Sequence, residues 1–250
     1  MPNPERIEKI MEILKEKTYA SVDFLVEELR YSPATVRRDL TYLAGQGLVK
    51  KYYGGVSINK SARPLAVRER DHVEDKRALC IEAAKLIKDG DTVFIDGGST
   101  TSYMGELLLS RKNLTVVTNN MKLAIFLGEQ GYPCTVTGGT VCDTAMLGGA
   151  NSCDIIEKMS FDVALLSMGV LSDEGFVTRA ENFREMQRLV LSHTVTSAYL
   201  CVRGSVVKHV SRRMYSRSIK GVSYVIGNAP FPKGLVERYP DTQFISTDVK

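Results

Sequence analysis

The chain has 250 residues, 44% hydrophobic and 25% charged, which is ordinary globular composition and enough for one large or two smaller domains. It is charged from its fifth residue and has no apolar run near the ~18 residues of a membrane span, so we expect neither signal peptide nor membrane anchor. Its five scattered cysteines argue against a disulfide framework or a zinc site and favour reduced thiols in a cytoplasmic protein. The net charge of +4 is too small to indicate nucleic acid, but residues 31–60 alone hold five basic side chains against one acidic.

Three helices are predicted at the start of the chain. Apolar residues repeat at helical spacing over residues 4–17, and Ser21 is a good cap for a second helix. Ser32 and Pro33 suit the cap and first position of a third helix, which should run to about Ala44. Two short helices joined by so tight a turn predict a helix-turn-helix, whose second helix enters the major groove of DNA.

The third helix is expected to present a polar face outward. We expect Thr35, Arg37 and Arg38 to face DNA, with at least one arginine reaching a guanine edge or a phosphate. Asp39 should orient an arginine or pair within the domain, because a carboxylate near phosphates is repelled. The apolar positions expected to face the core are Ala34, Val36, Leu40 and Leu43.

A basic hairpin is predicted next, in the sequence GLVKKYYGGVSI. Leu48 to the two tyrosines should form one strand, Gly54 and Gly55 a tight turn, and residues 56–58 the return strand. Beside a recognition helix such a hairpin would grip phosphates or a minor groove. Lys50 and Lys51 should then add affinity that is independent of sequence and falls steeply with salt.

The remainder of the chain alternates between strand and helix patterns. Residues 59–75 are polar and are expected to form a linker that merges into a helix. Nearly continuous apolar strands that alternate with helices predict a mostly parallel sheet covered on both faces, with ligands beyond the carboxyl ends of its strands. The predicted strands are 91–96, 114–118, 134–139, 161–169, 197–203, 222–227 and 242–246, and the predicted helices 101–109, 121–131 and 181–193.

Several predicted strand ends consist of glycines and small polar residues. The first, IDGGSTTS, combines glycines that permit close backbone approach with hydroxyls and amides at a helix start, which can hold an anion. Together the four segments predict a pocket for a polyhydroxylated, phosphorylated small molecule. They are residues 95–102, 117–120, 137–140 and 147–150.

No metal site and no cofactor are predicted. The three histidines are isolated along the chain and are expected at the surface or at helix ends. Cys142 and Cys153 flank one glycine pair, but no local basic cluster indicates a lowered thiol pKa, so a structural role is favoured over a redox sensor.

These motifs resemble the DeoR family of bacterial transcriptional regulators. The stretch from Thr35 to Leu40 matches the family's Thr-hydrophobic-Arg-Arg-Asp-Leu recognition helix, and Tyr53 stands where the family usually has the histidine of His-Gly-Gly. The EDK of 74–76, DGGSTT, VTNN, the paired glycines and a late ENFREMQR helix are similar, in order, to the family's sensor domain. The DNA-binding residues that we carry over or predict are Ser32, Thr35, Arg37, Arg38, Lys50, Lys51 and Tyr53.

The resemblance implies a fold like the sugar-phosphate isomerases and a phosphorylated sugar or related metabolite as effector. Asp96 would then hydrogen-bond the sugar hydroxyls. The domains expected are a winged helix-turn-helix at 1–58, the linker at 59–75, and an effector and oligomerisation domain at 76–250. The other effector-binding residues predicted are Gly97 and Gly98 in the loop, Ser99, Thr100 and Thr101 around phosphate, and Asn119, Gly138 and Gly139 in the wall.

Three positions depart from the family's pattern. The family's Asp-x-Ser-Lys falls on CVRGSV at 201–206, its late-helix lysine on Gln187, and its final Thr-Asp on Gly227-Asn228. These changes remove charges that would contact a ligand, and the sequence does not place a substitute among Arg179, Arg203 and Lys122.

We therefore predict a DNA-binding regulator without enzymatic activity, a repressor of a carbohydrate-metabolism operon controlled by a phosphorylated sugar. It should act as a homodimer or homotetramer on double-stranded operator DNA, away from membranes. Two alternatives stay open: an isomerase-like enzyme, and a DNA-binding protein whose large domain only oligomerises. The first of these lacks the lysine expected opposite Asp96 for acid–base chemistry.

Overall fold

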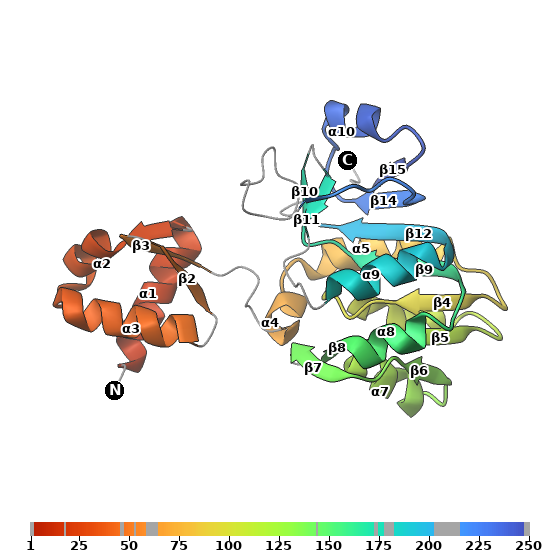
Figure 1. The fold of residues 1–250 in the computed structure, drawn as a ribbon, viewed down its shortest axis with the longest axis horizontal. Helices are drawn as coiled ribbons and strands as arrows, with labels where there is room; N and C mark the ends of the chain where they lie inside the picture. Colours follow the sequence, from red (N-terminus) through yellow and green to blue (C-terminus); the bar gives the residue numbers. More distant parts are fainter. Residues whose placement is uncertain are drawn as a thin grey trace. The chain divides into compact units, whose positions relative to one another are not determined.

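The computed structural model divides into two compact units, Met1–Arg63 and Pro64–Lys250, each described here by itself (Figure 1). The structure describes residues 3–17, 19–45, 48–52, 54–58, 65–143, 145–172, 175–177, 183–202 and 216–247.

The first unit has the predicted helices and hairpin. Ser21 caps α2 by accepting a hydrogen bond from the amide of Phe24 at 3.1 Å, and Ser32 accepts one from the amide of Thr35 at 3.3 Å at the start of α3. A short strand that we did not predict, β1, pairs with β3, so the described strands form an antiparallel sheet in the order β1-β3-β2. The elements are α1 (Pro4–Lys17), β1 (Tyr19–Ser21), α2 (Val22–Leu29), α3 (Pro33–Gly45), β2 (Val49–Tyr52) and β3 (Gly55–Ile58).

A single apolar cluster lies between these helices and the hairpin. On α3 it receives Val36, Leu40 and Leu43, which recur every three or four residues and so share one helix face. Ala34, which we expected in this core, is exposed, because it lies roughly 160° around the helix from Val36. The other buried members are Ile10, Leu14, Ala20, Leu25, Leu29, Val49 and Val56.

The second unit is built on a parallel sheet, as predicted. Its described strands are ordered β15-β14-β12-β9-β4-β5-β6, and every neighbouring pair is parallel. The predicted α/β class with helices on both sides is therefore confirmed. The strands are β4 (Thr92–Ile95), β5 (Thr115–Thr118), β6 (Cys134–Val136), β9 (Phe161–Ser167), β12 (Thr194–Cys201), β14 (Tyr224–Gly227) and β15 (Gln243–Ser246).

Side chains of each strand alternate between two apolar clusters. Val93 and Ile95 face α5, α6 and α7, whereas Phe94 between them faces the side of α8, α9 and α10. In Figure 1, α9 and α8 lie in front of the sheet and α5 lies behind it. These helices are α5 (Val73–Ala84), α6 (Gly105–Leu108) after the 3-10 turn η1 (Thr101–Met104), α7 (Met121–Glu129), α8 (Ala150–Ile156), α9 (Arg184–Ser192) and α10 (Lys233–Arg238).

Smaller elements that we did not predict are added to this unit. The hairpin β7–β8 follows β6, and three short strands form a second small antiparallel sheet. Within the segment expected to be a linker, residues 65–70 form a helix, α4, which belongs to the second unit, while 59–64 lie outside the described residues. Their bounds are α4 (Leu65–Arg70), β7 (Thr140–Asp143), β8 (Met146–Gly148), β10 (Val170–Ser172), β11 (Gly175–Val177) and β13 (Ser216–Arg217).

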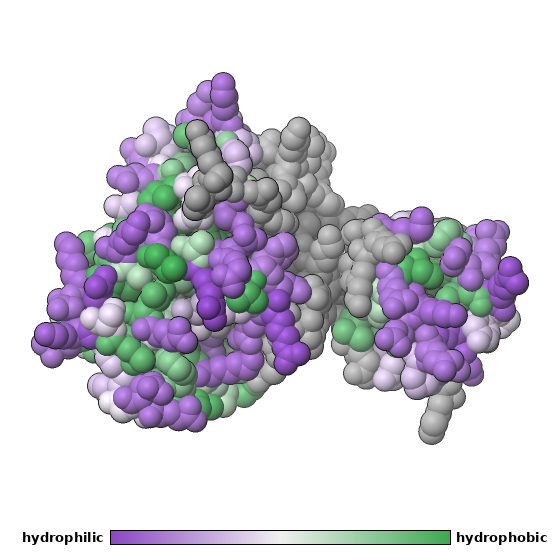
Figure 2. Space-filling view, turned by 180° about the vertical axis from the view of Figure 1, so that it is seen from behind, coloured by the Kyte–Doolittle hydropathy of each residue, from purple (hydrophilic) through white to green (hydrophobic). Residues whose placement is uncertain are grey.

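Among the described residues, no helix is both long and apolar enough to cross a bilayer. On the face shown in Figure 2, hydrophobic residues form separate spots among hydrophilic ones. Scattered apolar residues of this kind are normal on a folded protein.

Candidate functional site

The exposed face of α3 carries the predicted arginines. Arg38 lies opposite the buried Val36–Leu40–Leu43 stripe, and Arg37 lies to one side of it. Both arginines are exposed, and their side chains make no hydrogen bond or ion pair with any residue that the structure describes. Their charges are therefore available to a ligand outside the unit.

Asp39 belongs to the interior of the first unit. It is 0% exposed and accepts hydrogen bonds from Arg6 of α1, one of them from Nη2 at 3.1 Å. The Arg6 guanidinium also lies 4.6 Å from the centre of the Tyr31 ring. Of the two roles we predicted for Asp39, pairing within the domain is the one observed, and it joins the recognition helix to α1.

The hairpin is joined to the same helix face. Lys51 Nζ of β2 donates a hydrogen bond to Thr41 Oγ1 at 3.0 Å, and Thr41 Oγ1 donates to the carbonyl of Arg37 at 2.8 Å. Lys50 and Lys51 are both exposed, so basic side chains from helix and hairpin share one surface. That surface can receive the phosphates of a DNA backbone.

The hairpin contains two adjacent tyrosines, and only the second of them was predicted to bind DNA. Tyr53, predicted to donate to a phosphate, lies outside the described residues. Its neighbour Tyr52 is 50% exposed and meets the ring of Tyr19 on β1 edge to face at 6.5 Å. Tyr19 is itself 48% exposed and lies on β1, a strand of three residues that we did not predict.

In the second unit, the predicted effector loop lies where the strand order reverses. The chain runs from β4 outward through β5 to β6, and then returns to the other side of β4 to form β9. In parallel α/β sheets this switch point opens a crevice beyond the carboxyl ends of the strands. Residues 96–101 follow β4 there, and Ser167 ends β9.

Asp96 organises this loop from within. Its Oδ1 accepts hydrogen bonds from Thr101 Oγ1 at 2.6 Å and the Gly98 amide at 3.1 Å, and its Oδ2 accepts one from the Ser167 amide at 2.8 Å. Burial raises the pKa of Asp96, although these donors act against that shift. Direct contact of Asp96 with sugar hydroxyls stays a prediction; both of its oxygens already bind protein donors.

The loop itself leaves donors for a ligand. Thr101 is fully buried and bonded to Asp96, whereas Ser99 is partly exposed. The backbone amides of Ser99 and Thr100 donate to no residue that the structure describes. A Cβ on Gly97 would lie 2.8 Å from Met146 Cγ, and one on Gly98 would lie 1.8 Å from Ser167 Oγ, so a side chain at either position would have to displace its neighbour.

The end of β5 adds two buried asparagines. Asn120 caps α7 by accepting from the amides of Lys122 and Leu123 at 3.0 and 3.3 Å. Asn119 Nδ2 donates to the Leu147 carbonyl at 2.9 Å, but within the described part of the chain its Oδ1 has no hydrogen-bond partner. A buried acceptor without a partner is rare, and it favours a polar ligand or water at that position.

The two glycines after β6 form the turn that leads into the hairpin β7–β8. Gly138 and Gly139 both have positive φ, +64° and +102°, which glycine adopts without strain. Ser152 Oγ donates to the Gly138 carbonyl at 2.5 Å, and a Cβ on Gly139 would lie 2.5 Å from the Gly148 carbonyl. These contacts are with β8 and α8, and a place for the two glycines in the wall of the effector site stays a prediction.

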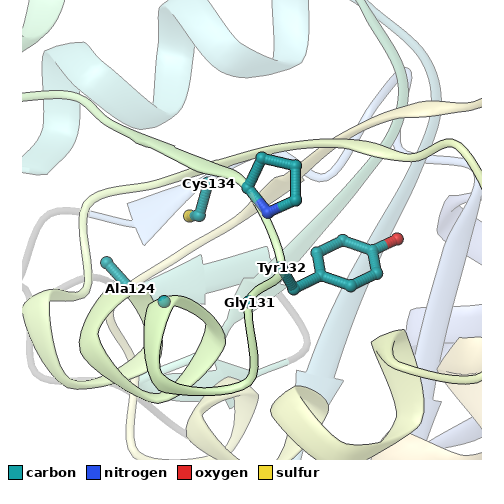
Figure 3. Close-up of a pocket in the computed structure, with 6 residues that line it drawn as sticks. Ala124, Gly131, Tyr132 and Cys134 are labelled. Carbon is teal, nitrogen blue, oxygen red and sulfur yellow. The ribbon is translucent and has the colours of Figure 1, made fainter.

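One surface hollow lies away from this edge. Figure 3 shows Tyr132 and Cys134 on the chain leading from α7 into β6, at the amino end of that strand. The strand ends of the candidate site are carboxyl ends, at the opposite edge of the sheet. No cluster of metal-ligating side chains occurs among the residues described.

Comparison with known proteins identifies the chain at the level of its family. Residues 6–62 match the family described as DeoR-like helix-turn-helix domain, and residues 71–215 match the DeoR C terminal sensor domain. The chain belongs to the DeoR family. The predicted class of DNA-binding transcriptional regulator is therefore confirmed.

Curated DeoR-type relatives are similar over most of their length. The "Glycerol-3-phosphate regulon repressor" of Escherichia coli (strain K12) is 31% identical over 70% of this chain and 71% of its own. The "Lactose phosphotransferase system repressor" of Lactococcus lactis subsp. lactis is 28% identical over 78% of this chain and 80% of its own. Among solved structures, ribose 5-phosphate isomerase A of Methanocaldococcus jannaschii covers 55% of this chain at 13% identity, with a TM-score of 0.41.

The departures from the DeoR pattern lie partly in the described residues. Gln187 is 6% exposed, and its Oε1 has no partner among the side chains and backbone groups that are described. Cys201 ends β12 in a fully buried position, where burial raises its pKa to about 12. Asn228 follows β14 at the same edge of the sheet. Arg179 and Arg203 lie outside the described residues, whereas Lys122 lies at the start of α7.

Proposed function

We propose that this chain is a repressor of a carbohydrate-metabolism operon whose affinity for operator DNA changes when a phosphorylated sugar or polyol binds its second unit. Two of the relatives are named as the glycerol-3-phosphate regulon repressor and the lactose phosphotransferase system repressor, which supports this class of effector.

The DNA-binding half of the proposal depends on the surface shared by α3 and β2. Arg37 and Arg38 are exposed and unpaired within the described residues, and Lys51 is held beside them through Thr41. Arginine recognises guanine and phosphate through the same planar donors. We propose direct DNA contacts for both arginines and phosphate contacts for Lys50 and Lys51.

The effector-binding half depends on one observation above all: the buried Asn119 Oδ1, at the strand end next to residues 96–101, has no hydrogen-bond partner among the described residues. This oxygen can accept a hydrogen bond from a ligand hydroxyl. The amides of Ser99 and Thr100, at the switch point of the sheet, can donate to a phosphate. One polar, anionic small molecule would use both features.

An isomerase activity is less well supported. Sugar-phosphate isomerisation needs a base within reach of the substrate, and both oxygens of Asp96 already accept bonds from three protein donors. We therefore propose that the second unit senses its ligand without converting it. We also propose that the chain acts as a homodimer or homotetramer, because paired half-sites require paired recognition helices.

The test is a fluorescence-anisotropy titration with DNA from upstream of the chain's own gene, at fixed salt. The wild-type chain should bind tightly, and Arg38→Ala should lose about 5- to 150-fold in specific affinity, the value of one bidentate base contact. Lys9→Ala removes the same charge from an exposed position of α1 and is the matched control, which should bind like the wild type.

Glycerol 3-phosphate and a panel of sugar phosphates are then added to the bound complex. A change of DNA affinity with one of them supports the regulator and names its effector. Isomerase turnover of a panel member would favour the enzyme instead. DNA binding that no member alters would favour a large domain that only oligomerises, and absence of specific binding would overturn the DNA-binding surface.

A further inference from the structure

A carboxylate from α4 reaches the effector edge of the sheet. Glu69 Oε2 pairs with Lys122 Nζ at 2.6 Å, and Glu69 Oε1 accepts a hydrogen bond from Ser102 Oγ at 2.9 Å. The Glu69 side chain is 17% exposed and that of Lys122 is 41% exposed, so the ion pair is open to solvent on the lysine side.

Both partners of Glu69 belong to the candidate site. Ser102 closes the loop that follows β4, since its amide donates to the Gly98 carbonyl at 3.1 Å and its hydroxyl shares one proton between that carbonyl, at 2.9 Å, and Glu69 Oε1. Asn120 Nδ2 donates to Ser102 Oγ at 3.1 Å, which joins this loop to the end of β5. The Lys122 ammonium group and the Ser102 hydroxyl therefore lie together at the switch-point edge, where both contact the Glu69 carboxylate.

Lys122 and Ser102 can together bind an anion, and in this structure they bind the carboxylate of Glu69 from the same chain. We propose that Lys122 and Ser102 belong to the phosphate subsite of the effector site, together with the Ser99 and Thr100 amides, and that the Glu69 carboxylate and the ligand's phosphate compete for Lys122 and Ser102. This inference rests on the proposed function, because it names where the phosphate of that effector binds. It also assigns to Lys122 the positive charge that the departures at 201–206 and at Gln187 remove.

Charge makes the competition possible. A phosphate monoester carries about −1.5 to −2 charges at pH 7 and three acceptor oxygens, against one charge and two oxygens for Glu69. The tethered carboxylate, however, acts at an effective concentration in the millimolar range. Inorganic phosphate should therefore displace Glu69 only at high concentration, whereas a ligand whose hydroxyls also bind the Asn119 amide should displace it at lower concentration.

Displacement of Glu69 affects α4, the helix that follows the connection to the DNA-binding unit. α4 is the first described element of the second unit, and residues 59–64 connect it to β3. Without its side-chain contacts, Glu69 still accepts the hydrogen bond from Tyr103 Oη to its carbonyl, at 2.8 Å, and the neighbouring Arg68 carbonyl still accepts one from Lys76 Nζ of α5. Because ligand and carboxylate exclude each other, ligand binding shifts α4 toward its released arrangement.

The experiment is a calorimetric titration of the full chain with inorganic phosphate. Glu69→Gln keeps the side-chain shape and removes the competing charge, so it should bind phosphate about tenfold more tightly than the wild type. Lys122→Gln should lose this binding, and the double variant should gain nothing over Lys122→Gln. Glu106→Gln is the matched control, because Glu106 is exposed on α6 and makes no ion pair with the described residues.

Limited trypsin digestion gives a second readout of α4. Cleavage after Arg68 and Arg70, measured by mass spectrometry, should accelerate when phosphate is added to the wild type, and should be fast from the outset in Glu69→Gln. Equal phosphate affinity in the wild type and Glu69→Gln, or cleavage that saturating phosphate leaves unchanged, would overturn the proposal. Neither assay contains DNA, so such a failure is separate from a failure of operator binding.

Discussion

The buried pair of Arg6 and Asp39 should determine whether the recognition helix stays folded. Both side chains are nearly inaccessible, at 7% and 0% exposed, and the two groups share two hydrogen bonds. Asp39→Asn removes the negative charge and leaves a buried guanidinium without a counter-ion. Breaking a buried pair from one side costs about 3–5 kcal/mol.

This loss is large compared with the stability of a small unit. At about 0.05–0.15 kcal/mol per residue, a unit the length of Met1–Arg63 is stable by only about 3–9 kcal/mol. Asp39→Asn should therefore raise hydrogen–deuterium exchange of the α3 amides in the full chain by about 100-fold or more, as 3 kcal/mol of lost stability implies. Amides of β9 and β12 in the second unit should be unaffected.

Two further variants isolate the cause. Glu8→Gln, on the exposed side of α1, should change α3 exchange less than threefold, because surface charges contribute little. The double variant Arg6→Met with Asp39→Leu should recover much of the loss, since an apolar pair leaves no charge buried. Exchange of α3 in Asp39→Asn within threefold of the wild type would refute the reasoning.

Two more predictions concern the loop after β4. Gly98→Ala should destabilise the second unit by about 1–3 kcal/mol, because the new Cβ would lie 1.8 Å from Ser167 Oγ and 2.1 Å from its Cβ. Adding Ser167→Gly should restore part of the urea midpoint, and an unchanged midpoint in Gly98→Ala would contradict the packing. Burial raises the pKa of Asp96 above its usual 3.8, so its share of stability is present below that pH and is lost as pH rises through the raised pKa. The stability of the wild type relative to Asp96→Asn, from urea unfolding between about pH 4 and 7, should therefore shrink with rising pH; a growing difference would contradict the burial of this carboxyl.

Local patterns were enough to predict most elements. Ser21 and Pro33 act within one turn of their own helices, and apolar strands repeat over a few residues, so neither needs distant partners. The short strand β1 and the helix α4 were missed for the converse reason. Their residues have too weak a local pattern, and their contacts come from β3, η1 and α7.

In the candidate sites too, features set by local pattern could be predicted, and contacts between distant residues could not. The arginines of α3 were predicted to be exposed and are exposed, because helical periodicity alone determines which face a residue occupies. The partner of Asp39, in contrast, is 33 positions away, and the partners of Asp96 include Ser167, 71 positions away. No spacing rule indicates such pairs; the packing of α1 on α3 and of β9 beside β4 brings them together.

The sequence by itself determined the helix-turn-helix, the parallel sheet and the chemical character of the strand ends, because each is encoded in neighbouring residues. Only the tertiary structure decided the use of each polar group. It turned Asp39 and Asp96 inward to bind protein donors, left Asn119 Oδ1 without a partner among the described residues, and brought Glu69 to Lys122. The physical reason is that a buried polar atom must find its partner in space, and the order of strands and helices determines which atom that is.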